Sequence, residues 1–539
     1  RSGDRHMNDD IRRMLACMSG GGAFLASYFV DSVGGSDSNN GLTVGTAKQT
    51  LAGLAAIGSL TRTEITFAAG SVFREQFLVP DQSHVIGNGA IVSGADVLPN
   101  ASFSLTAAQT NTYEISLPSI PLTSNPYASV TSDRVLQAWE NNVRIGPTFG
   151  GQSSIAGVEA NAGSWWWDNT AKKLYIHPSD SGNPITNGKV YEASVRTLAV
   201  HGGDGFTVED VVGEKAGART QGGQQGYGIL GYKSGTYLRC CGRRGWNHSG
   251  GVANGETANP LTFDECEFSD HERQSITAAS TCFVAFKSPA AQANVIVKDC
   301  YAHMPTYDAA YADIGLFAHG PNIKVIWQGT NFSKNFRFGR QLVLDGGATS
   351  EHQVDDQLVA DTCQYGDYVA TTAGITGVDV VAKDCTGAAV DARVACSVAV
   401  RSIDCAAGVI GFGQSGSPHI VNVENSKIIR TNAPASFFDG AGVQQTNTHV
   451  TFRLTGTLCY RIGRIYAGAG ANLDAPGCDN NDFSGAVRIY NDTLYVPSFS
   501  TLLSVWQTVS GEDANSVASS TIPAGADFIL PTWSGTLAP

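Results

Sequence analysis

The sequence predicts an all-β protein built as a parallel β-helix, and three observations support this. Short segments that alternate apolar and polar residues recur 20 to 34 residues apart, and most of them end in the same small residue. Alternation is the periodicity of a strand, and self-similarity at this spacing is typical of a solenoid of stacked coils. Charged residues make up only 15% of the chain and glycine is abundant, which suits short strands and tight turns.

The recurring small residue predicts a ladder of inward side chains at one angular position of the coils. Six of the segments end in cysteine, namely Cys241, Cys266, Cys300, Cys363, Cys385 and Cys405, and three others end in Val211, Thr330 and Ser426. Free cysteine behaves as a small buried hydrophobe, so reduced thiols in a core are expected. A disulfide framework is the alternative, but stapled secreted domains are shorter and denser in cysteine.

The segment before the first coil predicts a cap. Residues 1–22 are expected to hold a tag remnant, a short helix and a linker, with no signal peptide. A strand, a turn rich in Gly, Asp and Asn, and a short helix N-capped by Thr50 then follow within residues 28–57. This order closely resembles the start of right-handed, pectate-lyase-like parallel β-helix proteins. The resemblance implies that the helix covers the open first coil, within a first region of residues 23–96.

Residues 97–197 lack the repeat and predict an inserted antiparallel subdomain. The stretch SWWWDNTAKKLYIHPSD, from Ser164, is typical of a hairpin with an Asp-Asn turn. Trp165, Trp166 and Trp167 could form a platform for a sugar ring, or could pack inside the subdomain. Three successive strand residues cannot all face one way, so at least one is expected in the core. Residues 198–460 then form the main β-helix, and residues 461–539 a C-terminal β cap or oligomerisation region.

Candidate catalytic acids lie in the longest coils, between Val211 and Cys363. Functional residues concentrate in loops on a rigid scaffold, and equivalent positions of adjacent coils lie about 4.8 Å apart. Glu272 and Asp313 both precede the second strand of their coils and are expected to be close, as the paired carboxylates of a glycosidase would be. Asp270 and Asp308 are further candidates for the catalytic acids, followed by the pair Asp345 and Glu351. The alternative for each acid is turn capping or solvation.

Other side chains in the same loops are candidate substrate ligands. Arg273 could hold a substrate carboxylate or form a salt bridge along the stack. Trp246 could stack on a sugar at the cleft wall or lie buried under a loop. The set of expected substrate-binding residues is Arg273, His271, Trp246, Arg243 and His319. No CxxC motif, Cys/His ligand set or calcium loop is recognisable, so neither a metal nor another cofactor is expected.

The N-terminal segment and the coil rhythm together resemble bacteriophage tailspikes and depolymerases of capsule or O-antigen. The resemblance implies a homotrimer in the phage tail that acts outside the host cell on a bacterial surface polysaccharide, with an adaptor protein bound near its N-terminus. A secreted bacterial protein is the alternative. The net charge of −13, with no basic block, argues against a nucleic-acid partner and against binding to an anionic membrane. No segment is long and apolar enough to predict membrane insertion.

Three functions remain open at this point. Glycoside hydrolysis by paired carboxylates is the first. A polysaccharide lyase is the second, because Arg243, Arg244 and Arg273 could neutralise a uronate while His271 removes a proton. A non-catalytic glycan-binding spike or adhesin is the third.

Overall fold

The computed structural model describes most of the chain up to residue 467 and three residues near its end. The described residues are 24–117, 135–146, 151–217, 226–253, 260–273, 280–286, 293–319, 322–343, 351–370, 375, 377–411, 419–429, 441–445, 450–455, 458–460, 464–467, 530–531 and 533. The chain divides into two compact units, residues 1–294 with 535–539, and residues 295–534. Within the described ranges, no helix has the length and hydropathy needed to cross a membrane.

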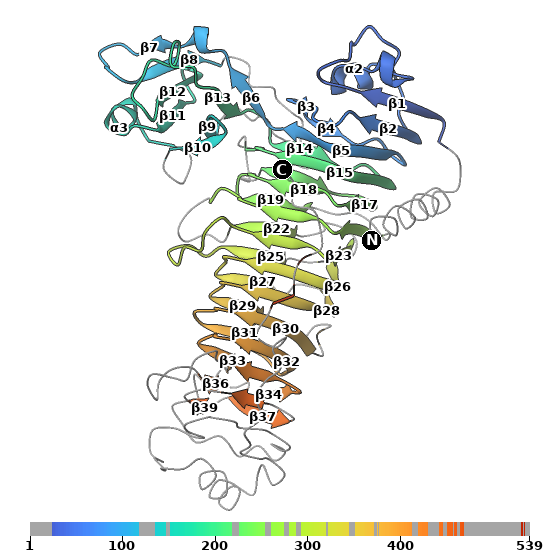
Figure 1. Ribbon diagram of the computed structural model, residues 1–539, viewed down its shortest axis with the longest axis vertical. Coiled ribbons are helices and arrows are strands. Elements are labelled where there is room, and N and C mark those ends of the chain that lie inside the picture. The colour runs from blue at the N-terminus through green and yellow to red at the C-terminus, as the bar shows by residue number, and fades with distance from the viewer. Residues whose placement is uncertain are drawn as a thin grey trace, which may run out of the picture. The chain divides into compact units, whose positions relative to one another are not determined.

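Parallel strands in the first unit stack coil upon coil (Figure 1). Sheet A of this unit contains β1 (Ala26–Val30), β2 (Thr63–Phe67), β3 (Val72–Phe73), β5 (His84–Ser93), β15 (Phe206–Glu214), β17 (Gly235–Leu238), β18 (Cys241–Arg243), β20 (Leu261–Asp264) and β21 (Glu267–Ser269). Sheet B contains β4 (Phe77–Leu78), β14 (Leu198–His201), β16 (Tyr227–Gly231), β19 (His248–Ala253) and β22 (Thr281–Phe286). Successive strands pair in parallel, so the fold is a right-handed parallel β-helix, as predicted.

The start of the first unit follows the predicted order. Strand β1 is followed by the 3₁₀ turn η1 (Val44–Thr46) and helix α2 (Leu51–Ala55). The Thr50 hydroxyl caps the helix by accepting from the backbone N–H of Gly53 at 2.8 Å, which confirms the predicted N-cap. The Glu75 carboxylate accepts from the first two N–H groups of the helix, those of Leu51 and Ala52. The helix that was expected near residues 8–18 lies outside the described residues.

Antiparallel strands occupy the segment between β5 and β14. One sheet has the order β10 (Val143–Ile145), β9 (Ala138–Glu140), β13 (Tyr191–Ser194), β6 (Ala95–Leu98), and the other β11 (Ser164–Asp168), β12 (Lys173–His177), β8 (Tyr113–Ser116), β7 (Ser104–Leu105). Two short helical segments accompany them, η2 (Asn100–Ser102) and α3 (Ile155–Ala160). The predicted hairpin is present as β11 and β12. Trp165 and Trp167 are buried in the core of this insert, while Trp166 faces the other way and stacks on Tyr175.

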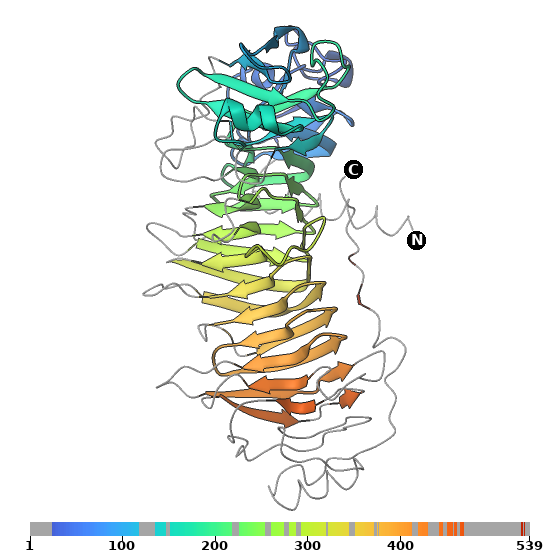
Figure 2. The same cartoon turned by 90° about the vertical axis from the view of Figure 1, so that its left-hand side faces the viewer.

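The second unit is also a stack of parallel coils (Figure 2). Its sheet A contains β23 (Ala293–Lys298), β24 (Tyr301–His303), β26 (Ile323–Lys334), β28 (Glu351–Asp361), β30 (Gly377–Lys383), β32 (Cys396–Ile403), β34 (His419–Glu424), β35 (Lys427–Ile429), β37 (Val450–Thr455) and β38 (Leu458–Tyr460). Its sheet B contains β25 (Ile314–His319), β27 (Phe338–Leu342), β29 (Tyr365–Val369), β31 (Ala388–Ala392), β33 (Ala407–Gly411), β36 (Ala441–Gln445) and β39 (Arg464–Ala467). Most of the expected C-terminal cap lies outside the described residues.

The cysteine ladder in the first unit is shifted by one residue from the prediction. Register pairs Cys241 with Glu267, so the residue aligned with Cys266 is Cys240. Cys240 directly follows Arg239, which has a left-handed backbone with φ of 50°. Both aligned cysteines are buried and free, so the expectation of inward thiols is confirmed while the choice of Cys241 was wrong.

The second unit shows that the cysteines occupy two corners of the coil, not one. Cys363, Cys385 and Cys405 are aligned with one another, and all are buried. Cys300 lies at the other corner and is aligned with Asn331, not with Thr330. At both corners a residue of left-handed backbone precedes the small inward residue, for example Asp299 and Asp384. The two corners therefore have the same short sequence pattern. The prediction, which rested on spacing, assigned both to one angular position.

Candidate functional site

The predicted acids of the first unit lie where the insert meets the coils. Arg144, on β10 of the insert, places its Nε 2.7 Å from Oε2 of Glu272. Its Nη2 donates to the backbone carbonyl of Asp270 at 3.0 Å, and Nη1 lies 3.5 Å from the Asp270 carboxylate. The two predicted acids are thus bridged by one guanidinium, and only 4% of Glu272 is exposed. Glu272 is held as an ion-pair partner of the insert.

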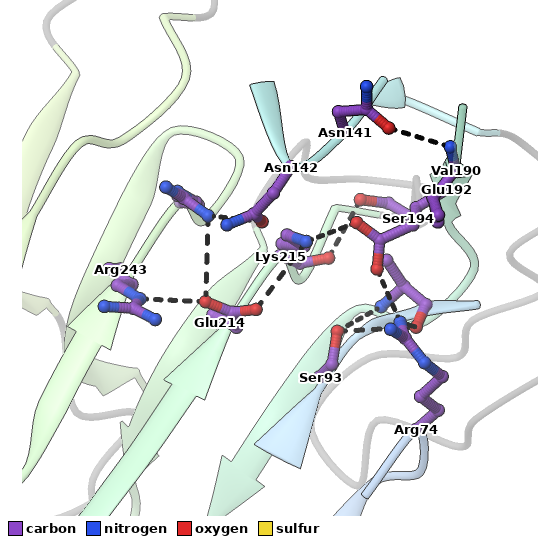
Figure 3. A network of polar contacts seen from close by, with 12 residues as sticks. Arg74, Ser93, Asn141, Asn142, Val190, Glu192, Ser194, Glu214, Lys215 and Arg243 are labelled. Atoms are coloured by element: carbon purple, nitrogen blue, oxygen red, sulfur yellow. Dashed lines mark hydrogen bonds and ion pairs between the residues drawn. The ribbon is translucent and has the colours of Figure 1, made fainter. Parts of the chain in front are cut away.

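Arginines of the coils extend this network (Figure 3). Arg243, expected to bind substrate, donates through Nε to Glu214 at 2.8 Å. Arg244 donates to the Oδ1 of Asn142 in the insert at 2.8 Å and lies 3.4 Å from the Asp270 carboxylate. Both cations are therefore engaged by groups of the protein itself, which argues against the role in a lyase that the sequence left open to them.

A second arm of the network is nearly buried. Glu192 of the insert lies between Lys215, at 2.5 Å, and Arg74, at 2.6 Å (Figure 3). Burial alone would raise the pKa of Glu192, but Lys215 and Arg74 outweigh it and hold the pKa below its ordinary value. The Lys215 ammonium also lies 5.3 Å from the ring centre of Trp139 in the insert. Taken together, these contacts fix the insert on the coils.

Two further predicted ligands of the first unit are buried. Trp246 is only 2% exposed. The prediction that it stacks on a sugar at a cleft wall is therefore wrong, and the alternative of a buried side chain holds. It pairs through its backbone with Glu272 and Ala216, which turns the side chain inward. His271 is 1% exposed, and its Nδ1 lies 3.2 Å from the thiol of Cys282. Arg273 is half-buried and contacts other groups of the chain.

The predicted acids of the second unit differ in exposure. Asp313 is 3% exposed, and its backbone carbonyl accepts from the N–H groups of Arg337 and Phe338. Asp308 is partly exposed, and its Oδ1 accepts from the backbone N–H of Ala310 at 3.0 Å. Glu272 belongs to the first unit and Asp313 to the second, so their pairing stays a prediction.

The remaining predicted residues add little to a site. The side chain of His319 lies outside the described residues, as does Asp345. Glu351 accepts from Lys324 at 2.9 Å, which is the ordinary behaviour of a surface ion pair.

An aromatic surface that sequence reasoning missed lies on sheet B of the second unit. Register aligns the residues of this sheet in rows, and one row is fully buried: Leu316, Arg340, Asp367, Val390 and Val409. Phe338 and Tyr365 lie two residues before this row, and Tyr368 lies one residue after it; all three side chains are half-buried. Their rings contact one another, so they lie on one side of the sheet. We call these three residues the aromatic platform.

The platform is a packed group. The rings of Phe338 and Tyr365 stack at 5.5 Å with 16° between their planes, and Tyr368 meets Phe338 edge to face at 5.1 Å. Arg393 lies with its guanidinium carbon 5.3 Å from the Tyr368 ring centre and donates twice to Asp391, at 2.7 and 2.8 Å. Burial and the nearby Asp391 raise the pKa of Tyr365, with smaller effects from Arg337 and Tyr307 among others. The phenol therefore stays protonated at neutral pH.

The loop before β25 lies at the edge of this platform. Tyr307 is close enough to Tyr365 to influence its pKa, and Asp308 is the next residue in the chain. The loop that contains Tyr307 and the partly exposed Asp308 therefore comes near the half-buried Tyr365. In the sequence, the signal was an aromatic residue followed by glycine at the start of two successive strands, in FGRQL and YGDYV. Among the described residues, no three or more His, Cys, Asp and Glu side chains are grouped to hold a metal ion.

Comparisons with known proteins give only distant likenesses. Neither a family model nor a curated protein matches the chain. The structure is similar to XylC in complex with xylose, at 11% identity and a TM-score of 0.41, over 87% of this chain and 85% of that one. It is also similar to a glycoside hydrolase, at 10% identity and a TM-score of 0.35, over 87% of this chain and 97% of that one. Its similarity to pectate lyase Pel9A has 13% identity and a TM-score of 0.36, over 78% of this chain and 80% of that one. Likenesses of this strength do not bear on function.

Proposed function

We propose that this protein binds a bacterial surface polysaccharide on sheet B of the second unit and hydrolyses it. The observation that carries the proposal is the aromatic platform, a stack of half-buried rings on a rigid parallel sheet. Aromatic faces bury the apolar faces of sugar rings, and adjacent polar groups give orientation. Successive coils repeat along the stack, which suits a polymer more than a single sugar.

Asp308 is the leading acid for the hydrolysis. It is partly exposed, whereas Glu272 and Asp313 are almost fully buried. A general acid must reach the glycosidic oxygen, so access decides between them. Hydrolysis also needs a second carboxylate, and Asp391 and Asp313 of the same unit are the candidates for that role. Asp391 lies next to the platform, but its charge is held by Arg393.

A lyase remains the second candidate, on one observation. The platform has two arginines beside a tyrosine, and a lyase needs a cation to neutralise a uronate and a base to remove its proton. The raised pKa of Tyr365 weakens this alternative, because a phenol that stays protonated is a poor base. Hydrolysis is therefore ranked first.

The resemblance of the sequence to tailspikes extends the proposal. We infer a homotrimer carried by a phage particle, with an adaptor bound near the N-terminus, and a secreted bacterial enzyme as the alternative. Light scattering of the purified protein tests the trimer directly, and a monomer in solution would remove that part of the proposal.

The test of the enzymatic activity uses capsular and O-antigen polysaccharides from a bacterial panel. On a polymer that is shortened, each product should gain the mass of water, whereas an unsaturated product that absorbs in the ultraviolet would indicate a lyase. Asp308→Asn should lower turnover by about 10²–10⁴. Tyr368→Ala should weaken binding, since stacking on one ring contributes about 1 kcal/mol. Binding without any cleavage would indicate a non-catalytic adhesin. If the protein binds none of the polymers, the proposal is wrong.

A further inference from the structure

Arg337 differs from every other arginine whose side chain is described. It is exposed, it directly precedes Phe338 of the platform, and its guanidinium carbon lies 5.3 Å from the Phe338 ring centre. No ion pair or hydrogen bond of its side chain occurs among the described residues. An arginine normally finds a carboxylate in a chain whose acids outnumber its bases, as here with 48 against 35.

The other arginines of the second unit show the contrast. Arg340 is bound by Asp356 and Asp367, and Arg393 by Asp391. Arg401 also has a partner within the chain. Arg337 is thus a cation that lies over an aromatic ring while its N–H groups remain available.

The surroundings keep the charge of Arg337 effective. Asp391, an acid beside the platform, is already neutralised by a bidentate pair with Arg393. Arg337 lies near enough to Tyr365 to lower the pKa of its phenol against the stronger effects of burial and Asp391. Arg337 and Tyr307 therefore both lie near Tyr365 at the edge of the platform.

We propose that Arg337 binds an anionic substituent of the polysaccharide and so determines specificity for an acidic polymer. The inference rests on the function proposed above and adds the charge class of the substrate. A guanidinium fork fits a carboxylate or a phosphate or sulfate ester with two parallel hydrogen bonds. The net charge of −13 repels polyanions at long range, so an acidic substrate needs a local cation of this kind.

The experiment compares Arg337→Gln and Arg337→Lys with Lys427→Gln. Lys427 is exposed on sheet A of the same unit, so its substitution removes the same charge away from the platform. Binding is measured on the polysaccharide that the protein cleaves, on its carboxyl-reduced form and on its form stripped of phosphate and sulfate esters. The reduced polymer identifies a uronate as the ligand, and the stripped polymer identifies an ester.

We expect Arg337→Gln to weaken binding of the native polymer about 10- to 100-fold, as for a lost hydrogen bond to a charged group. Arg337→Lys should recover part of this, and Lys427→Gln should bind normally. On the polymer that lacks the recognised anion, wild type and Arg337→Gln should bind alike. An equal loss on all three polymers, or none on the native one, would overturn the inference. If Arg337→Gln binds the native polymer normally but Tyr368→Ala binds it less tightly, the platform is still supported as the binding site. If both Arg337→Gln and Tyr368→Ala bind it normally, both proposals end.

Discussion

Aromatic stacks on sheet B are closed in the first unit and half-buried in the second. In the first unit, the row that contains Tyr227 and His248 is buried, although these rings stack at 5.2 Å much as the platform rings do. In the second unit, the stack of Phe338 and Tyr365 is half-buried. Burial raises the pKa of Tyr227 in the first unit above its ordinary value.

The difference shows that access, and not residue type, separates a candidate site from a packed wall. Charged residues of the coils in the first unit bind one another and the insert. In the second unit, the exposed side chain of Arg337 has no ion pair or hydrogen bond among the described residues. Predictions on both units can strengthen or weaken this distinction.

The largest effect is expected from the charged cluster in the core of the second unit. The side chains of Arg340, Asp356 and Asp367 are all fully buried, and Arg340 lies between the two acids at 2.7 Å from each. Arg340→Met would leave two buried carboxylates without a partner, which should destabilise the fold by about 3–5 kcal/mol. The thermal midpoint measures this, and Arg337→Gln is the matched control that should leave it unchanged.

The pH dependence of that variant gives a second readout. Burial raises the pKa of Asp367 in the folded protein even with Arg340 present. A carboxyl whose folded pKa is above its unfolded value favours folding at low pH, and this contribution is lost as pH rises through the folded pKa. The Arg340→Met protein should therefore lose most stability at neutral pH and least near pH 4. If Arg340→Met has the thermal midpoint of the wild type at both neutral pH and pH 4, the cluster contributes nothing to stability.

A smaller effect is expected at the ion pair between the insert and the coils. Arg144→Gln should destabilise the protein by about 1–3 kcal/mol, because it leaves the buried Glu272 carboxylate without its charged partner. Glu272→Gln should cost less, and the double variant should lie between them. Turnover per folded molecule should be unchanged in all three. If Glu272→Gln instead lowers turnover by about 10²–10⁴ with no change in midpoint, Glu272 is catalytic, as the sequence first indicated.

The sequence was sufficient for the fold and insufficient for the site, and particular residues show why. Period-two alternation and Thr50 depend only on local preferences, so the coils and the N-cap of α2 were predictable. Whether Trp246 faces a groove or the core depends on which strands cover it, and that is a long-range property. The platform escaped notice because Phe338 and Tyr365 become neighbours only when the coil register is known.

Buried histidines provide a pH test in each unit. Burial lowers the pKa of His201 in the first unit and of His352 in the second to about 4. A histidine whose folded pKa is below its unfolded value, about 6.5, destabilises the fold as pH falls between the two values. Each shift corresponds to about 3 kcal/mol at most. His352→Leu should flatten the decline of the thermal midpoint between pH 6.5 and 4. His201→Leu should flatten it independently. An unchanged decline in both variants would mean that other groups govern acid unfolding.

The smallest effect is expected at the cysteines that lie between two strands of sheet A. Cys266 in the first unit and Cys300 in the second are fully buried and free, and in both the thiol contacts a backbone carbonyl within two residues. Serine places a more polar hydroxyl in the same space, so each substitution should cost about 1 kcal/mol, and no more than about 3. Alanine at the same positions serves as the control for lost volume alone. Equal midpoints for the serine and alanine variants would show that burial of the hydroxyl carries no penalty. Titration of the unreduced, denatured protein should also find these thiols free, and few free thiols would contradict the ladder in both units.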